Sequence, residues 1–308
     1  MMAIPLLKKI SELFLILFAT AGLVKGKILK ADDSRVLSRL SLNLITPCVI
    51  FNSFQKELAP GVASGLLVSA GLAAAFQLVF LALGEVLRRI WKASEVERAS
   101  VVFTNAGNLV IPLVHYALGS EWVIYISAYI TVFNILFWTI GIRMFDRGGA
   151  SIKKILLNPN MLAVMAGLIS LLIGLKLPEP VALAFEEVAA MIGPLSMMIT
   201  GMIVGSMNLR DLFSYRRVGG VILFRMGVAS GLAVLASALF CRVSGISAPL
   251  VLIPMLSAIA PSASNINQVA ILYNKDAKYA SVINVLTTLS CIVTIPLWVM
   301  VYEMMTGI

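Results

Sequence analysis

The chain consists largely of long apolar stretches separated by short charged segments. Seven stretches lack charged side chains, and each exceeds the roughly 18 apolar residues that a helix needs to cross hydrocarbon. These are Leu58–Gly84, Ala99–Ser120, Trp122–Ile142, Ile155–Leu175, Val188–Leu209, Val243–Asn274 and Tyr279–Tyr302. Three weaker stretches are Ile10–Val24, Leu37–Phe54 and Val218–Phe240, the last interrupted by Arg225. The pattern predicts an all-α integral membrane protein with ten transmembrane helices.

Two of these stretches contain candidate helix breaks. The fourth predicted helix contains Asn105, Asn108 and Pro112, and the ninth contains Pro261, Asn265, Asn267 and Gln268. Hydrocarbon offers the backbone no hydrogen-bond partner, so an interrupted, amide-rich helix is stable only beside a protein-lined cavity. Matched breaks in two halves of a chain indicate a transporter's binding site. We therefore predict broken, crossing helices 4 and 9 around a neutral substrate site. The alternative is that these amides only hold packed helices together.

Three pairs of landmark residues recur at nearly one spacing. Pro47 and Pro194 are 147 residues apart, Pro112 and Pro261 are 149 apart, and Asn134 and Asn284 are 150 apart. The spacing predicts two repeats of five helices, and an odd number of helices inverts the second copy. We expect a first repeat over 1–147, a short cytoplasmic linker over 148–157 and a second repeat over 158–308. Coincidence among the twelve prolines is the alternative.

The net charge of +9 is explained by its distribution along the chain. With the N-terminus outside and ten helices alternating, 17 Lys and Arg residues fall in inner loops and five in outer segments. The positive-inside rule then predicts a multi-pass protein of the plasma or inner membrane with both termini non-cytoplasmic, and no nucleic-acid partner is needed. Cleavage of the signal-like N-terminal segment would spoil this count, and we retain it as the first helix.

The sequence lacks the motifs of the common membrane hydrolases and ATPases. All five aspartates fall in predicted loops, His115 is the single histidine, and no Walker A, His-Glu-x-x-His or Gly-x-Ser-x-Gly motif occurs. The three cysteines have no paired spacing and predict neither a disulfide framework nor a metal cluster. We expect a protein that is not an enzyme and has no cofactor. The coupling ion would be H⁺ or Na⁺, with sodium near Asn105 and Asn265.

Five further polar residues are secondary site candidates: Asn43, Thr46, Gln77, His115 and Arg225. Arg225 lies in an apolar helix, where an arginine normally faces an interior partner or a cavity. It either complements an anionic substrate or extends toward the inner headgroups. His115 is either a titrating gate or a hydrogen-bonded structural residue.

Several short motifs occur in an order found in one transporter family. They are Ser41–Phe51, Asn134–Gly141, Asn158–Asn160, Gly193–Leu195 with Thr200 and Gly201, Ala260–Asn265, Ala277–Ser281 and Thr294–Leu297. The ordered set resembles the auxin efflux carrier family, which includes the plant PIN proteins and bacterial malate or malonate permeases. The long hydrophilic loop of the large plant PINs is absent here, because only Asp146–Leu157 lies at that place.

The resemblance implies ten helices in two inverted repeats, similar to the bile-acid symporters. It implies a scaffold of helices 1, 2, 6 and 7 that forms a homodimer, and a transport unit of helices 3–5 and 8–10 that moves like an elevator. The family's substrate site carries over to Asn105, Asn108, Pro112, Pro261, Asn265 and Asn267. We expect a secondary transporter of small organic anions, namely auxin-like acids or dicarboxylates. The rivals are a sodium-coupled symporter and a ligand-sensing membrane protein that transports nothing.

Overall fold

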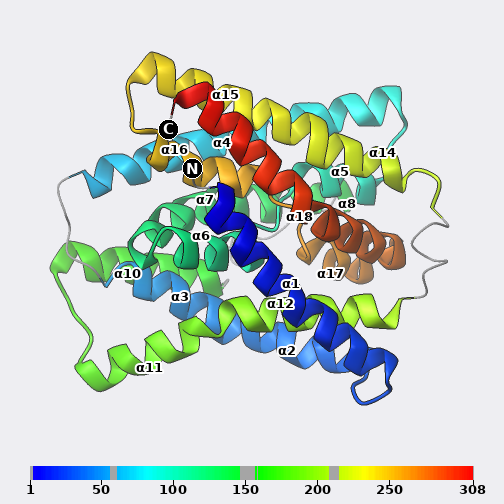
Figure 1. Ribbon diagram of the computed structural model, residues 1–308, viewed down its shortest axis with the longest axis horizontal. Helices are drawn as coiled ribbons and strands as arrows, with labels where there is room; N and C mark the ends of the chain where they lie inside the picture. Colours follow the sequence, from blue (N-terminus) through cyan, green and yellow to red (C-terminus); the bar gives the residue numbers. More distant parts are fainter. Residues whose placement is uncertain (1–2, 56–60, 146–156, 158, 208–214, 308) are drawn as a thin grey trace.

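The protein is helical throughout the part of the chain that the structure describes. The computed structural model describes residues 3–55, 61–145, 157, 159–207 and 215–307, apart from some side chains within helices. All regular elements in these ranges are helices, and no strand occurs among them (Figure 1). The predicted linker 148–157 lies outside the described residues, except for Leu157. The all-α class predicted from the apolar pattern is confirmed.

Helix length and composition define a multi-pass membrane protein. Five helical segments in the described residues are long and apolar enough to cross a membrane: Val62–Ile90, Val123–Phe145, Glu179–Ser206, Val218–Ser244 and Ala277–Thr306. Pro159–Ile173 and Ala248–Ile259 are shorter apolar helices. The helical form follows from the environment, because hydrocarbon leaves backbone groups no partner outside the helix itself.

The first half of the chain contains α1 to α8. The helices are α1 (Ala3–Lys25), α2 (Ser34–Leu40), α3 (Thr46–Ser53), α4 (Val62–Ile90), α5 (Glu95–Val102), α6 (Ile111–Ala117), α7 (Val123–Leu136) and α8 (Ile142–Phe145). Three π-helices join some of them: η2 (Ser41–Ile45), η3 (Ala106–Val110) and η5 (Phe137–Gly141). Two short 3₁₀ helices are η1 (Ala31–Asp33) and η4 (Ser120–Trp122).

The second half contains fewer π turns. Its helices are α10 (Pro159–Ile173), α11 (Glu179–Ala190), α12 (Ile192–Ser206), α14 (Val218–Ile222), α15 (Ser230–Ser244), α16 (Ala248–Ile259), α17 (Asn265–Leu272) and α18 (Ala277–Thr306). The π-helix η6 (Leu223–Ala229) joins α14 to α15. The predicted span Val188–Leu209 starts earlier in the structure, at Glu179, so Glu186 and Glu187 lie within a helix.

The segment that resembles a signal peptide is packed into the fold as α1. Figure 1 shows α1 lying across α12, and two glycines of α12 permit the close approach. A Cβ atom on Gly201 would collide with the Leu17 carbonyl oxygen, and one on Gly205 would lie 2.6 Å from the Ala21 carbonyl oxygen. Small residues allow membrane helices to pack backbone to backbone, so α1 and α12 form a tight pair.

A polar cluster ties the start of α5 to the start of α18. Ser94 and Glu97 form a capping box at the N-terminus of α5. The buried Glu97 carboxylate also accepts a 3.0 Å hydrogen bond from the Tyr279 hydroxyl, and Lys275 pairs with Glu95 at 2.9 Å. The sequence analysis overlooked Glu97, because it lies two residues before the predicted apolar span.

Candidate functional site

The first interruption lies at Phe103–Asn105, seven to nine residues before Pro112, to which the sequence pattern assigned the break. Helix α5 ends at Val102, Phe103 is extended with φ −103° and ψ 132°, and the chain becomes helical again at Ala106. Pro112 lies in the first turn of α6, where a missing N–H is tolerated. The assignment of the break to Pro112 is therefore wrong. The π turn of η3 directly before it accommodates the proline without a break.

The second interruption lies at its proline. Helix α16 ends at Ile259, and α17 begins at Asn265. Ala260 is extended, with φ −60° and ψ 156°, as steric contact with the ring of a following proline favours. Pro112 and Pro261 thus occupy different places relative to the two breaks, although the sequence spacing pairs them.

The two interruptions bond to each other. The Asn105 N–H donates to the Pro261 carbonyl at 2.8 Å, and the Ala263 N–H donates to the Phe103 carbonyl at 3.0 Å. Thr104 and Ser262 form the resulting antiparallel bridge. Each extended segment therefore supplies the backbone partners that the other lost when its helix ended, which a low-dielectric interior requires.

Helix α18 braces the second interruption. The Asn284 amide donates to the Ser262 carbonyl at 2.7 Å, and the Thr287 hydroxyl accepts from the Ser262 N–H at 3.2 Å. Asn134 of α7, which the sequence spacing pairs with Asn284, has no such contact. Its Nδ2 is buried and has no hydrogen-bond partner among the described residues.

Arg225 of η6 is fully buried beside both interruptions. Its guanidinium donates from Nε to the Ala260 carbonyl at 3.0 Å, from Nη1 to the Val101 carbonyl at 3.0 Å, and from Nη2 to the Ala258 carbonyl. The face of Phe80 lies 4.9 Å below it. The interpretation that Arg225 extends toward the headgroups is wrong, because tertiary contacts with helix ends hold it inside.

Arg225 thus lies where α5 and α16 end, before the two interruptions. A small central cavity lies after the interruptions, where η3 and α17 begin. Its lining residues are Thr46, Thr104, Asn105, Gly107, Ile130, Phe133, Asn134, Asn160, Ala263, Ser264 and Asn265. The centre of a water-sized sphere can occupy about 40 Å³ of this cavity. One water needs about 10–15 Å³ by this measure, so the cavity holds an ion or a few waters in this conformation.

The central cavity favours negative charge. The first N–H groups of a helix lack intrahelical acceptors, and the helix dipole adds partial positive charge there. Both η3 and α17 present this end to the cavity, through Gly107 and Asn265. The Thr46 hydroxyl and Asn134 Nδ2 are buried polar atoms without hydrogen-bond partners in the described residues. This arrangement suits a small anionic group such as a carboxylate.

Three of the predicted site residues line this cavity: Asn105, Asn265 and Thr46. Pro112 and Pro261 are buried near it without lining it, and Asn267 is half-buried elsewhere on α17. The side chains of Asn108 and Gln268 lie outside the described residues, and only their helical backbone is placed. The sequence analysis missed Asn134 as a site residue, although its pairing with Asn284 had already marked it.

The other secondary candidates lie away from the central cavity. Asn43 is exposed on η2, and its amide donates to the Arg39 carbonyl at 2.8 Å in the same helix. Gln77 is buried in α4 and donates to the Tyr129 hydroxyl at 3.4 Å. His115 lines a separate cavity of about 580 Å³, together with Lys176, Glu186 and Glu187. Asn43 therefore does not line the central cavity.

Two larger cavities flank the central one. The cavity containing His115 shares two helical segments with the central cavity. Gly107 of the central cavity and Ile111 and His115 of the other lie along one face of η3 and α6. Thr46 of the central cavity and Val49 of the other lie at the start of α3. The second flanking cavity, of about 800 Å³, is lined at its charged rim by Glu85, Arg88, Glu95, Arg98, Arg143 and Lys275. These rim residues belong to loops and helix ends that the charge distribution predicts to be cytoplasmic.

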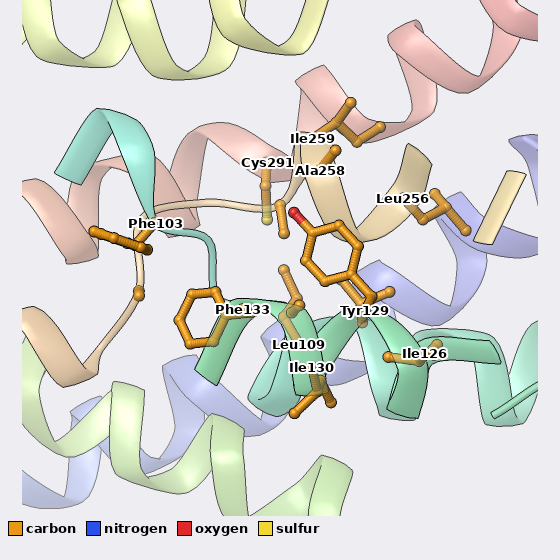
Figure 2. Close-up of a cluster of buried hydrophobic side chains, with 14 of the residues drawn as sticks. Phe103, Leu109, Ile126, Tyr129, Ile130, Phe133, Leu256, Ala258, Ile259 and Cys291 are labelled. Carbon is orange, nitrogen blue, oxygen red and sulfur yellow. The ribbon is translucent and has the colours of Figure 1, made fainter. Parts of the chain in front are cut away.

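Aromatic side chains lie between the central cavity and the second flanking cavity, which we call the basic cavity. Phe133 and Phe137 stack with ring centroids 5.5 Å apart, and Phe103 packs edge-on against both. Figure 2 shows Phe133 and Tyr129 of α7 near Leu109 of η3, with Ala258 and Ile259 at the end of α16. Phe133 lines the central cavity, and Ile140 and Met144, one and two turns beyond Phe137, line the basic one. The aromatic cluster therefore separates the two cavities.

A chain of apolar helices with a buried polar cavity between two interrupted spans has the architecture of a membrane transport protein. Residues 5–155 match the family model described as Membrane transport protein. This region contains α1 to α8, including Thr46, Asn105 and Asn134, and the match places it in that family. The resemblance to the auxin efflux carriers is thereby confirmed. No match is found among curated proteins.

Proposed function

We propose that the protein is a secondary transporter of small organic anions that binds their carboxylate in the central cavity. The observation that supports this most directly is the convergence of two helix N-terminal ends, η3 and α17, on one buried cavity lined by amides and hydroxyls. Helix N-termini bind carboxylates through free N–H groups and the helix dipole. Asn105 and Asn265 add neutral donors, and Ile130 and Phe133 face the apolar part of the substrate.

The proposal includes an inverted-repeat architecture. Ten membrane-crossing segments would form two five-segment repeats, and α5–η3–α6 and α16–α17 would be their crossing pair. A scaffold of α1, α2–α3, α10 and α11–α12 would form a homodimer, and the remaining helices would move as an elevator. The tight pairing of α1 with α12 and the polar ties between α5 and α18 support this division into two bodies. The membrane would be the plasma or inner membrane, with both termini non-cytoplasmic.

The size of the central cavity supports a moving site. Organic ligands occupy pockets of about 300–1,000 Å³, far more than the 40 Å³ open here. The site would therefore have to widen to admit a substrate. In the proposed cycle, the moving helices shift against the scaffold. The central cavity then opens toward the cavity of His115 in one position and toward the cavity rimmed by Arg88 and Arg143 in the other.

The test is uptake by the purified protein in proteoliposomes. A thermal-shift screen of dicarboxylates, indole acids and bile acids first identifies a bound carboxylate. Asn105→Ala and Asn265→Ala are expected to lower its uptake about tenfold or more, because each removes a hydrogen bond to a charged group. Asn43→Ala is the matched control, since its exposed amide bonds the Arg39 carbonyl one turn earlier in the chain, and it should transport normally. Normal uptake by both site variants would refute the proposal.

The ion-sized cavity also favours a sodium-coupled mechanism as a second candidate. Amide and hydroxyl oxygens near Asn105 and Asn265 would then hold sodium, and replacing sodium by potassium should abolish uptake. Unchanged uptake would favour proton coupling or uniport. If the carboxylate binds and stabilises the protein without any flux, the protein is a ligand sensor and not a transporter.

A further inference from the structure

Arg225 contacts both interrupted spans at once. Val101 belongs to the last turn of α5, Ala258 to the last turn of α16, and Ala260 to the extended segment that follows. The last carbonyls of a helix have no intrahelical donor. The guanidinium supplies donors to one such carbonyl from each helix, and these helices belong to opposite halves of the chain.

The charge of Arg225 matches this position. The C-terminal ends of α5 and α16 carry partial negative charge from their dipoles, and both point at the guanidinium. None of the ion pairs found in the described residues involves Arg225. Carbonyl groups, helix ends and the Phe80 ring therefore compensate the buried cation.

The backbone around Arg225 is shaped for this role. Arg225 lies in the π-helix η6, whose wide turn leaves carbonyls unbonded within the helix. The Ser230 hydroxyl donates to the Arg225 carbonyl at 3.0 Å, and the Trp298 indole donates to the Met226 carbonyl at 2.7 Å. The π turn and its two external donors fix the direction of the arginine side chain.

We propose that Arg225 is a positioning residue that couples the two interruptions, so that the N-terminal ends of η3 and α17 face the central cavity as one preassembled site. Its three hydrogen-bond acceptors, Val101, Ala258 and Ala260, do not line that cavity, so it acts through the helix ends. The significance of the cavity as a ligand site rests on the proposed function, but the coupling itself does not.

The test is hydrogen exchange of the full-length protein without ligand, comparing Arg225→Lys with the unmodified chain. A lysine keeps the charge but lacks the planar fork that reaches three carbonyls. Amides of residues 103–110 and 260–268 should exchange about 10- to 100-fold faster, because hydrogen bonds to charged groups contribute that factor. Arg242→Lys is the matched control, since Arg242 bonds only the Met305 carbonyl, and it should change neither segment.

The outcomes separate coupling from a local or general structural role. Faster exchange in both segments, with the remaining helices unchanged, supports the proposal. Unchanged exchange in both, acceleration in only one, or equal acceleration throughout the helices would overturn it. The measurement needs no substrate, so failed uptake and failed coupling are distinguishable.

A second pair of variants tests the proposal if Arg225→Lys does not fold. Phe80→Leu keeps every hydrogen bond of the guanidinium and removes the ring beneath it. It should accelerate exchange in the same two segments by a smaller factor. Phe76→Leu, also buried in α4 and stacked on Phe80, is the control and should accelerate neither. Exchange at the original rate in both segments of Phe80→Leu would contradict the proposal.

Discussion

The two interrupted spans share a bridge but differ in how the surrounding helices support them. Besides the contacts with Arg225, the second is held by the regular α-helix α18, in which Asn284 and Thr287 bond both backbone groups of Ser262. The first is flanked by the π-helices η3 and η5, and Asn134 of α7 directs an unpartnered amide group into the cavity region. Since π turns mark functional sites and hinges, the comparison indicates a rigid second span and an adaptable, ligand-facing first span.

The strongest test of this comparison removes the brace of the second span. Asn284→Ala leaves the buried Ser262 carbonyl without its side-chain donor, which costs about 1–3 kcal/mol of stability. We expect the larger figure, because Ser262 and Asn284 are both buried, and a lower thermal midpoint in detergent should report it. Asn43→Ala, at an exposed amide, should leave the midpoint unchanged. An unchanged midpoint in Asn284→Ala would mean that the second span is not held by α18.

The same substitution in the first half should affect ligand binding instead. Asn134→Ala removes an amide Nδ2 that bonds nothing in the described residues, so the thermal midpoint should remain close to that of the unmodified protein. Affinity for the identified carboxylate should fall about tenfold, as for loss of one hydrogen bond to a charged group. Titration by thermal shift measures both quantities. Destabilisation as large as that of Asn284→Ala would remove the distinction between the spans.

The smallest expected effect concerns Gly107 in η3. A Cβ atom there would meet no atom within 4 Å, and the residue lines the central cavity. Gly107→Ala should stabilise the protein by about 0.4–1 kcal/mol through the unfolded state, while filling space that a ligand needs. Gly71→Ala on α4 has equally open surroundings and should stabilise without weakening ligand binding. Unimpaired binding in Gly107→Ala would place the ligand elsewhere.

The sequence predicted those features that depend on local composition. Uncharged apolar runs predicted the all-α membrane class, and clustered amides identified Asn105 and Asn265, which line the cavity. The position of the first break was not predictable in this way. Its backbone partners are Pro261 and Ala263 in the other half of the chain, and these long-range hydrogen bonds fix it at Phe103–Asn105. Pro112 lies in the first turn of α6, directly after the π turn η3, and does not set the position of the break.

The role of Arg225 was equally inaccessible to local reasoning. An arginine in an apolar helix indicates an interior partner, yet its acceptors are backbone carbonyls, which have no signature in the side-chain sequence. Asn134 and Asn284 show the same limit. Their spacing makes them equivalent, and only tertiary structure shows that one bonds Ser262 while the other faces the cavity.

The bridge between Thr104 and Ser262 also imposes an order on biogenesis. The ribosome delivers Phe103 to the membrane long before Ala263, whose N–H its carbonyl needs. During that interval the backbone groups of the newly inserted first span must form hydrogen bonds with water, lipid headgroups or the translocation machinery. The first span therefore completes its backbone hydrogen bonding only after Pro261 and Ala263, in the second half of the chain, have been inserted.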